Sequence, residues 1–309
     1  MRSVLRPATL CLILAVAVAA TAADSLERID NGTLQVGVDR AKGGAIAWLS
    51  WRGHPGNAVN VHDAGRLIQQ SYYAGAALDR RGDGQHAAWS PWPWNPIQAG
   101  GVASWSTVTR FERTADGRMV GETTGKLWDM PDEDAAAVIR QTTGFVPGLD
   151  HVVVMKCDLE CQRMGGDRWG PPVPRHQELP ACYLTRSFDR VKSYLGAGRW
   201  RDETIAPGPP WGRVRPPQGV VACFDAAGQG VAIYAPEATE AWNVGPHGDG
   251  ASGDPAADPC MHVAPLATAA LGPRSVFRYQ AWLAVGDERA IAAAADALAR
   301  ADGQPLDRD

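Results

Sequence analysis

The fold is decided by Thr33-Leu-Gln-Val-Gly-Val-Asp39, which is followed, after Lys42-Gly43-Gly44, by Ala45-Ile-Ala-Trp48-Leu-Ser-Trp51. Apolar and polar residues alternate in the first run, as they do in a β-strand with one buried face. The Gly-Gly pair indicates a tight turn, and the second run indicates the returning strand. The sequence therefore predicts that the chain opens with an antiparallel β-hairpin.

The rest of the chain repeats this pattern of short strands and turns. Further hairpins are expected around the turn sequences at 114–117, 147–150 and 226–228. A last strand is predicted over 275–285. One helix follows over 288–301, capped by Asp287 and ended by Gly303. Many short strands with long aromatic loops favour an all-β fold: a large antiparallel β-sandwich with one C-terminal helix.

The N-terminus has the layout of a secretory signal peptide. Arg2 and Arg6 precede an apolar run over 10–20, and Ala20-Thr21-Ala22 matches a small-x-small cleavage site. The run is too short to span a bilayer, and no later run is long enough for a membrane helix. We expect residues 1–23 to be a signal peptide, residues 24–309 to form a single β-sandwich domain, and the mature protein to be secreted or periplasmic.

Charge and cysteine content limit the possible partners. The formal net charge of −4 argues against nucleic acid, which calls for a basic surface. In an exported protein some cysteines should pair, and an odd number leaves at least one thiol free. Their spacing, without nearby His ligands, matches no zinc pattern, so neither a metal nor a cofactor is predicted. The five cysteines after the leader are Cys157, Cys161, Cys182, Cys223 and Cys260.

The richest candidate for a functional site is the stretch 63–98, where polar recognition groups stand beside aromatic rings. Sugars offer apolar C–H faces that stack on such rings, and hydroxyls that need directional polar partners. Its three Trp residues could instead plug one end of the sandwich, but a plug would not need polar residues that are costly to bury unpaired. We therefore predict a carbohydrate site, with substrate bound by Gln69, Gln70, His86, Trp92, Trp94, Asn95 and Gln98.

A second candidate is His176-Gln177-Glu178, between a proline-rich loop and a predicted strand. Glycoside hydrolysis commonly uses two carboxylates, and Asp63 with Glu178 is the best candidate pair. An acid at a loop–strand junction can equally bond a backbone N–H group or an Arg. Each of the two acids can therefore be interpreted either as catalytic or as structural.

A polysaccharide lyase would use the same region differently. Arg66 would hold a uronate carboxylate bidentately. His86 or His176 would act as the base, because His titrates near neutrality. Tyr72 or Tyr73 would donate the proton. The sequence leaves hydrolase and lyase open.

The opening hairpin with its Gly-Gly turn, the expected large antiparallel sheets and the polar-aromatic loops resemble the galactose-mutarotase-like β-supersandwich. That fold occurs in aldose epimerases and in domains of several glycoside hydrolases and polysaccharide lyases. The resemblance covers the general pattern of most of the chain and carries no catalytic motif. A jelly-roll lyase or hydrolase is the rival at the level of the fold, and fold alone does not fix function.

The residues and the resemblance together predict a secreted carbohydrate-active enzyme that cleaves a polysaccharide or oligosaccharide by glycoside hydrolysis. One alternative is a polysaccharide lyase acting on a uronate-containing glycan. Another is a non-catalytic carbohydrate-binding protein or a mutarotase-type epimerase. Acids and a His that converge in one aromatic cleft would favour an enzyme. A flat aromatic strip without acids would favour a binding protein.

Overall fold

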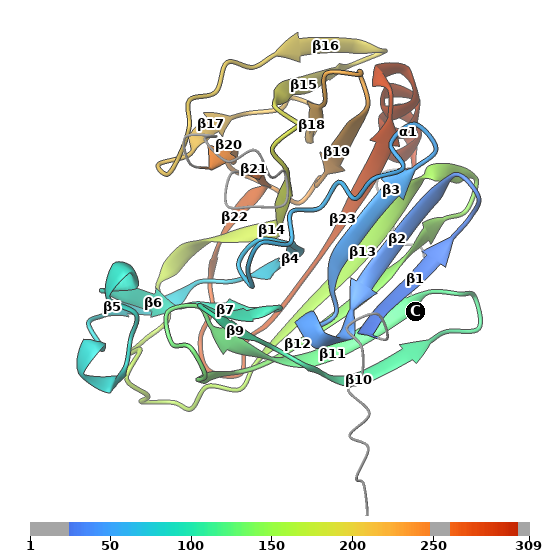
Figure 1. Ribbon diagram of the computed structural model, residues 1–309. Coiled ribbons are helices and arrows are strands. Elements are labelled where there is room, and N and C mark those ends of the chain that lie inside the picture. The colour runs from blue at the N-terminus through green and yellow to red at the C-terminus, as the bar shows by residue number, and fades with distance from the viewer. Residues whose placement is uncertain (1–24, 248–259, 302–309) are drawn as a thin grey trace, which may run out of the picture.

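The computed structural model describes residues 25–247 and 260–301, so the expected signal peptide lies outside the described residues. Antiparallel strands form two layers (Figure 1). The first layer has the order β1–β2–β3–β4–β14–β21–β20–β17, and β22 also pairs with β14. Its strands are β1 (Leu26–Asp30), β2 (Leu34–Asp39), β3 (Ala45–Trp51), β4 (Ile68–Ser71), β14 (Pro174–Thr185), β17 (Gly212–Val214), β20 (Trp242–His247), β21 (Cys260–Ala264) and β22 (Leu266–Ala270).

The second layer has the order β10–β11–β12–β13–β23–β19–β18–β15–β16. Its strands are β10 (Val108–Arg113), β11 (Met119–Leu127), β12 (Asp134–Val146), β13 (Leu149–Cys161), β15 (Arg190–Gly196), β16 (Arg199–Asp202), β18 (Val220–Phe224), β19 (Gly230–Tyr234) and β23 (Val276–Gly286). Strand β7 (Pro96–Ile97) pairs with β4 and with β11, so it joins the two layers. The all-β sandwich expected from the sequence is confirmed.

The loops contain shorter strands and 3-10 helices. Two small hairpins are formed by β5 (Ala74–Leu78) with β6 (Trp92–Trp94), and by β8 (Gly100–Gly101) with β9 (Ser104–Trp105). Three short 3-10 helices are η2 (Arg40–Lys42), η3 (Arg81–Asp83) and η4 (Ala87–Trp89). The segment 74–101, expected to be long and irregular, is therefore built from short elements around its Trp residues.

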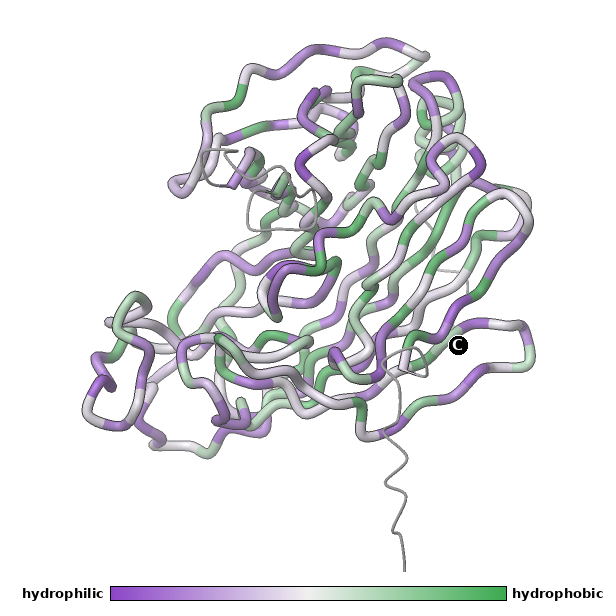
Figure 2. The backbone as a smooth tube through the Cα atoms, viewed as in Figure 1, coloured by the Kyte–Doolittle hydropathy of each residue, from purple (hydrophilic) through white to green (hydrophobic). Residues whose placement is uncertain are grey.

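The core fills the space between the layers. Val36 and Leu49 of the first layer pack in one cluster with Met155 and Leu283 of the second. Figure 2 shows the corresponding hydrophobic stretches along the central strands, whereas polar residues concentrate in the connections. Because side chains alternate along a strand, each layer also has a face turned away from the core.

The one long helix in the described part of the chain, α1 (Glu288–Arg300), covers the outer face of the second layer. Ile291 and Leu298 pack there against Trp282 and Phe224. The Asp287 carboxylate accepts a hydrogen bond from the backbone N–H of Ala290, so the predicted cap is confirmed. No helix among the described residues is long and apolar enough to cross a membrane.

The opening hairpin forms as expected between β2 and β3, with Leu34 opposite Trp51 and Asp39 opposite Ala45. Gly43 has a φ of 60°, in the left-handed region that favours glycine. A Cβ atom at Gly43 would lie 2.0 Å from the carbonyl oxygen of Gln98. The turn therefore packs directly on the backbone of the tryptophan-rich segment.

Three segments differ from the expectation. Strand β14 begins at Pro174, so His176 and Glu178 lie within a strand and not at its junction with a loop. Strands β17 and β20 lie in segments rich in proline and glycine. Prolines and glycines indicated breaks there, but pairing with neighbouring strands overrides that local preference.

The expectation that some cysteines pair is wrong for the described residues, in which no disulfide joins any two of these five buried cysteines. Cys157 and Cys161 lie four residues apart on strand β13, and a rise of ~3.3 Å per residue separates them too far for a disulfide. Cys182 and Cys223 are fully buried core residues. These thiols serve as small apolar side chains.

We expect Gly43→Ala to lower the free energy of unfolding by about 3 kcal/mol or more, because left-handed strain adds to the clash with Gln98. Gly117→Ala is the matched control. Gly117 has a φ of +84°, and a Cβ atom added there would have no neighbour within 4 Å, so a loss of only about 1 kcal/mol is expected. Urea unfolding of both variants measures the difference. Equal losses would contradict the role assigned to the Gly43–Gln98 contact.

Alkaline pH should destabilise the protein. Burial raises the pKa of Tyr72, Tyr279 and the Cys182 thiol well above their ordinary values. In the unfolded chain thiols titrate near ~8.5 and tyrosines near ~10, so unfolding releases protons above those values. The stability from these groups is complete below about pH 8 and falls by about 1.4 kcal/mol per pH unit for each titrating group. Denaturant unfolding between pH 7 and 11 tests this, and a flat profile would contradict it.

Candidate active site

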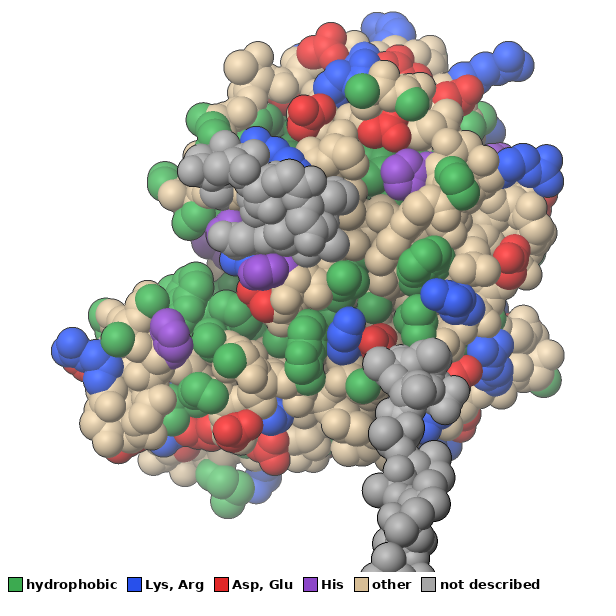
Figure 3. Space-filling model, in the orientation of Figure 1, with side chains coloured by type: hydrophobic (Ala, Val, Ile, Leu, Met, Phe, Trp, Pro, Cys, Tyr) green, Lys and Arg blue, Asp and Glu red, His purple; other side chains and the backbone are tan. Residues whose placement is uncertain are grey.

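A cleft with two lobes opens on the outer face of the first layer. The larger lobe has a volume of about 370 Å³ and the smaller about 180 Å³. The larger lobe alone falls within the roughly 300–1,000 Å³ of ordinary ligand sites. Figure 3 shows hydrophobic side chains beside a hollow between the upper part of the molecule and the lower left lobe. The two lobes meet where they share the lining residues Tyr73, Glu178 and Trp211.

Glu178 enters the cleft from β14. Its backbone lies opposite Leu266 of β22 on one side and Ser71 of β4 on the other. The register between β14 and β4 shifts between Glu178 and Ala181. Such an irregularity re-aims side chains. The residue is only 8% exposed, so an ionisable carboxyl group lies at the floor of the cleft.

The imidazole ring of His262, on β21, lies beside the carboxyl group of Glu178. Its neighbours Met261 and Val263 point into the core, so His262 points to the opposite face, toward the cleft. The distance from His262 Nε2 to Glu178 Oε1 is 3.6 Å. His262 is fully buried, and neither of its ring nitrogens makes a hydrogen bond within the described residues. Because unpartnered buried polar atoms are costly, Glu178 is the group with which His262 can share a proton.

Two aromatic rings fix the orientation of His262. Tyr183 lies opposite it in the strand register, and the two rings stack at 4.4 Å with an angle of 26°. Trp211 contacts it at 4.3 Å between ring centroids. Burial raises the pKa of Tyr183 well above its ordinary value, and the nearby charge of Glu178 raises it further. The hydroxyl group of Tyr183 therefore stays protonated.

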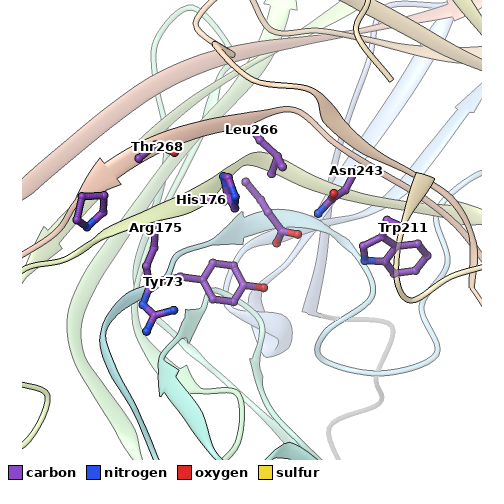
Figure 4. Close-up of a pocket in the computed structure, with 9 residues that line it drawn as sticks. Tyr73, Arg175, His176, Trp211, Asn243, Leu266 and Thr268 are labelled. Atoms are coloured by element: carbon purple, nitrogen blue, oxygen red, sulfur yellow. The ribbon is translucent and has the colours of Figure 1, made fainter. Parts of the chain in front are cut away.

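Tyr73 stands at the junction of the lobes. The Gln177 side chain accepts a hydrogen bond from the Tyr73 N–H (2.9 Å) and donates one to the Tyr73 carbonyl (2.8 Å). Burial raises the pKa of the Tyr73 hydroxyl, and the charge of Glu178 adds to the shift. In Figure 4 the Tyr73 hydroxyl and the Asn243 amide point toward the same space. Tyr73 is thus a fixed hydroxyl donor near the carboxylate.

Asp63 lines the smaller lobe together with Glu178. One carboxylate oxygen accepts a hydrogen bond from Arg66 at 2.7 Å, and the other accepts one from the Gly65 N–H at 2.9 Å. The Asp63 side chain remains 29% exposed. The two acids that the sequence paired therefore face one lobe, one held by an Arg and the other beside a His.

Three Trp rings wall the smaller lobe. Trp89 meets Trp92 at 5.1 Å and 72°, and it meets Trp128 at 5.4 Å and 75°, both edge to face. All three rings are partly exposed. Gly65 permits the approach of Trp128, because a Cβ there would lie 2.7 Å from that ring. Flat aromatic faces beside carboxylates are the combination that binds sugar rings.

A buried ion pair anchors this wall. Arg80 donates to Asp129 at 2.6 Å, and both side chains are nearly inaccessible, with exposures of 3% and 0%. Gln85 donates to the same carboxylate oxygen at 2.6 Å. The Asp129 carbonyl also accepts the His86 N–H. Since Trp128 precedes Asp129 and Trp89 follows this loop, the pair fixes two walls of the lobe.

His176 lines the larger lobe, but its ring already has a carboxylate partner. Its Nδ1 lies 3.0 Å from Glu240, and its side chain is 56% exposed. Arg175 lines the same lobe and donates its Nε–H to the Gly75 carbonyl. Across residues 25–247 and 260–301, no three His, Cys, Asp or Glu side chains are grouped so that they could hold a metal ion.

Three residues that the sequence assigned to substrate binding brace the interior. Gln69, Gln70 and Gln98 are almost fully buried. Their amide groups bond backbone atoms: Gln69 to Ala64 and Ala99, Gln70 to Arg140, and Gln98 to Gly43. None of the three lines either lobe. We therefore correct their assignment from substrate binding to structural support. Buried backbone groups need hydrogen-bond partners where these segments cross the core, and the three glutamines supply them.

Three further candidates lie outside the lobes. Tyr72 is fully buried and donates to Gln70, and Trp94 is 1% exposed and donates to the Ala135 carbonyl. Exposed His86 accepts the Ala88 N–H at the start of η4. Asn95 and Trp92 do line the smaller lobe, where the indole N–H of Trp92 donates to Asn95.

Sequence reasoning missed His262 and Trp211. A His flanked by apolar residues in Cys260-Met-His262-Val is a signal for His262, but nothing local indicates its partner Glu178. Trp211 lies in a segment that the sequence predicts to be a loop. Asn243 and His247, both of β20, and Trp128, after β11, also line the cleft, and these two segments are far from Glu178 in the sequence.

Removing the buried charge of Asp129 should be costly. Asp129→Asn removes the fully buried counter-ion of Arg80 and leaves it only the partly exposed Glu133 at 3.2 Å, and breaking a buried pair costs up to about 3–5 kcal/mol. The matched control is Asp79→Asn, which breaks the exposed Arg81–Asp79 pair of similar length and should change little. Thermal unfolding compares the two variants. Equal stabilities would contradict the anchoring role.

Comparisons with known proteins support the architecture. No protein-family model matches the chain, and no curated protein matches it in sequence. The solved structure of a candidate aldose 1-epimerase from Escherichia coli is similar, with a TM-score of 0.50 and 11% identity over 84% of this chain and 98% of that protein. A galactose mutarotase-related enzyme from Lactobacillus acidophilus gives 0.46 and 9% identity over 84% and 97%.

At 11% identity the likeness to the Escherichia coli protein concerns the fold alone. The resemblance drawn from the sequence is therefore confirmed: the chain has a galactose-mutarotase-like β-sandwich fold.

Proposed function

We propose that this protein is an enzyme that acts on an oligosaccharide or polysaccharide, with Glu178 as the residue that transfers the proton. The observation that carries the proposal is the position of Glu178. It lies where the two lobes meet, at the cleft floor, with His262 behind it and Tyr73 beside it. A carboxyl group held in this way is suited to general acid–base chemistry.

An enzyme accounts for the cleft better than a binding protein does. A binding surface needs aromatic faces, but it has no need for a buried Glu–His pair. Desolvating such a pair is costly, and buried acid–base groups that border a cleft are typical of functional sites. Asp63 and Glu178 line the same aromatic lobe, which supports the carboxylate pair of a glycoside hydrolase.

The proposed roles follow from the contacts. Glu178 is the acid or base closest to the bond that is broken, and Asp63 is the second carboxylate. Arg66 holds Asp63 in place through a charge-assisted hydrogen bond. The Trp wall stacks on a sugar ring, and a neighbouring ring of the chain occupies the larger lobe. Tyr73 and Asn243 supply hydrogen bonds to substrate hydroxyls.

A mutarotase-type epimerase is the second candidate, and one observation favours it. In this mutarotase-like fold, Glu178 lies 3.6 Å from the buried His262, so one carboxylate and one imidazole stand together at the cleft floor. Mutarotation needs proton transfer at a single sugar ring and cleaves no glycosidic bond. The two candidates differ in their products, which can be measured directly.

Glu178→Gln should lower turnover by about 10²–10⁴-fold, the usual cost of removing a general acid or base. The control is Glu240→Gln, which removes a carboxylate paired with the cleft-lining His176 and should leave turnover largely intact. The purified protein is first screened against a polysaccharide panel, with reducing ends and unsaturated-uronate absorbance read together. Aldose mutarotation is followed by polarimetry.

The outcomes separate the candidates. New reducing ends without absorbance support the hydrolase, absorbance supports a lyase, and a change in optical rotation alone supports the epimerase. Near-normal rates of Glu178→Gln in the active assay would overturn the role given to Glu178. Sugar binding without any turnover across the panel would replace the enzyme with a binding protein.

A further inference from the structure

A second groove lies on the first layer, outside the cleft. It has a volume of about 720 Å³ and shares no lining residue with either lobe. Strands β1 and β3, helix η2 and the segment after β9 form its walls. Its lining is mostly apolar, but three cationic side chains border it: Arg28, Arg40 and Lys42.

The groove forms where Gly37, which has no side chain, leaves a gap on the surface of the sheet. Gly37 of β2 pairs with Arg28 of β1 on one side and with Trp48 of β3 on the other. A Cβ at Gly37 would lie 3.0 Å from Trp48 and 3.1 Å from Arg28. The missing side chain lets the Arg28 guanidinium lie 4.5 Å over the Trp48 ring. Arg28 is thus held against the indole although it is exposed.

Two more cations lie over aromatic rings nearby. Lys42 lies 5.0 Å over Trp105, and Arg40 lies 5.8 Å over Phe111. Lys42 is also 3.4 Å from Asp39, and Arg40 is 3.3 Å from Glu27. The Arg28 guanidinium forms no ion pair with a carboxylate of the described residues. The groove therefore has aromatic surface together with cationic groups in excess.

We propose that this groove is a second glycan-binding site, for a saccharide that carries uronate or sulfate groups. Arg28 is the main contact, because a guanidinium binds carboxylate and sulfate oxygens with two parallel hydrogen bonds. Trp48, which lines the groove, supplies aromatic surface for a sugar ring beside the guanidinium. The inference uses none of the cleft residues, so it stands independently of the proposed catalytic function.

A glycan fits the groove better than a nucleic acid does. The chain as a whole is acidic, with a formal net charge of −4, and three of its cations gather at this one groove. Nucleic-acid sites instead present long basic surfaces. The loop after β3 supplies Val61 to the groove, and Asp63, two residues later, lines the smaller lobe.

The test compares three probes by isothermal titration calorimetry: oligogalacturonate, dextran sulfate and neutral dextran. The wild type should bind one or both charged probes, with weaker binding at higher salt, and should show no such binding of dextran. Which charged probe binds distinguishes carboxylate from sulfate. Arg28→Ala should reduce affinity at least about tenfold, as expected for a lost charge-assisted hydrogen bond. Arg28→Lys should retain part of it.

The controls separate the groove from the cleft and from general charge effects. Arg199→Ala removes an exposed Arg from β16 of the second layer and should not change the affinity. Glu178→Gln should keep the groove binding whether or not the proposed function is right. Thermal unfolding of every variant checks the fold.

Unchanged affinity in Arg28→Ala would overturn the proposal, as would equal binding of neutral dextran. Loss of binding in Glu178→Gln would move the site to the cleft. Tighter binding of a single-stranded oligonucleotide of equal charge would replace the glycan with a nucleic acid.

Discussion

The structure depends on the exchange of hydrogen bonds between Gln70 and Gln98. The Gln98 side chain accepts the Gln70 N–H at 3.0 Å, and the Gln98 N–H donates to the Gln70 carbonyl at 3.1 Å. The Gln98 amide also donates to Gly43 in the turn of the opening hairpin. Gln69 accepts the Ala99 N–H beside them. These bonds fix β4, the hairpin turn and the end of the tryptophan-rich segment against one another, and thereby set the position of the cleft walls.

Because side chains alternate along the strands of the first layer, the residues next to core residues face the candidate cleft. Met261 and Val263 pack in the core, so His262 faces the cleft. Cys182 and Leu184 pack there as well, so Tyr183 stacks on His262 from the neighbouring strand. Glu178, His262 and the ring that supports them are therefore carried by strands whose other face is the core. Groups mounted on such elements hold their geometry better than groups on loops.

Features that depend only on residues close together in the sequence could be predicted from it. The hairpin over 33–51 and the cap at Asp287 need only alternation, a Gly-Gly turn and a capping carboxylate, and the structure contains both. The function of Gln98 was not predictable, because its partner Gln70 is 28 residues away and becomes its neighbour only after folding. The same holds for His262 and Glu178, which meet through the pairing of β14 with β21 and β22. A polar residue in an aromatic segment signals a need for partners, but it does not say whether these are backbone groups or a substrate.

The two layers differ in what covers their outer faces, and this difference explains where the candidate sites lie. Helix α1 packs Ile291 and Leu298 on the outer face of the second layer and so covers much of its central strands. The first layer has no such helix among the described residues, and its outer face holds both the cleft and the Arg28–Trp48 groove. Its aromatic rings would be costly to expose without use, yet they remain partly open beside charged groups. Aromatic surface kept accessible in this way, on strands braced from below by the core, is what a protein that binds an extended sugar chain requires.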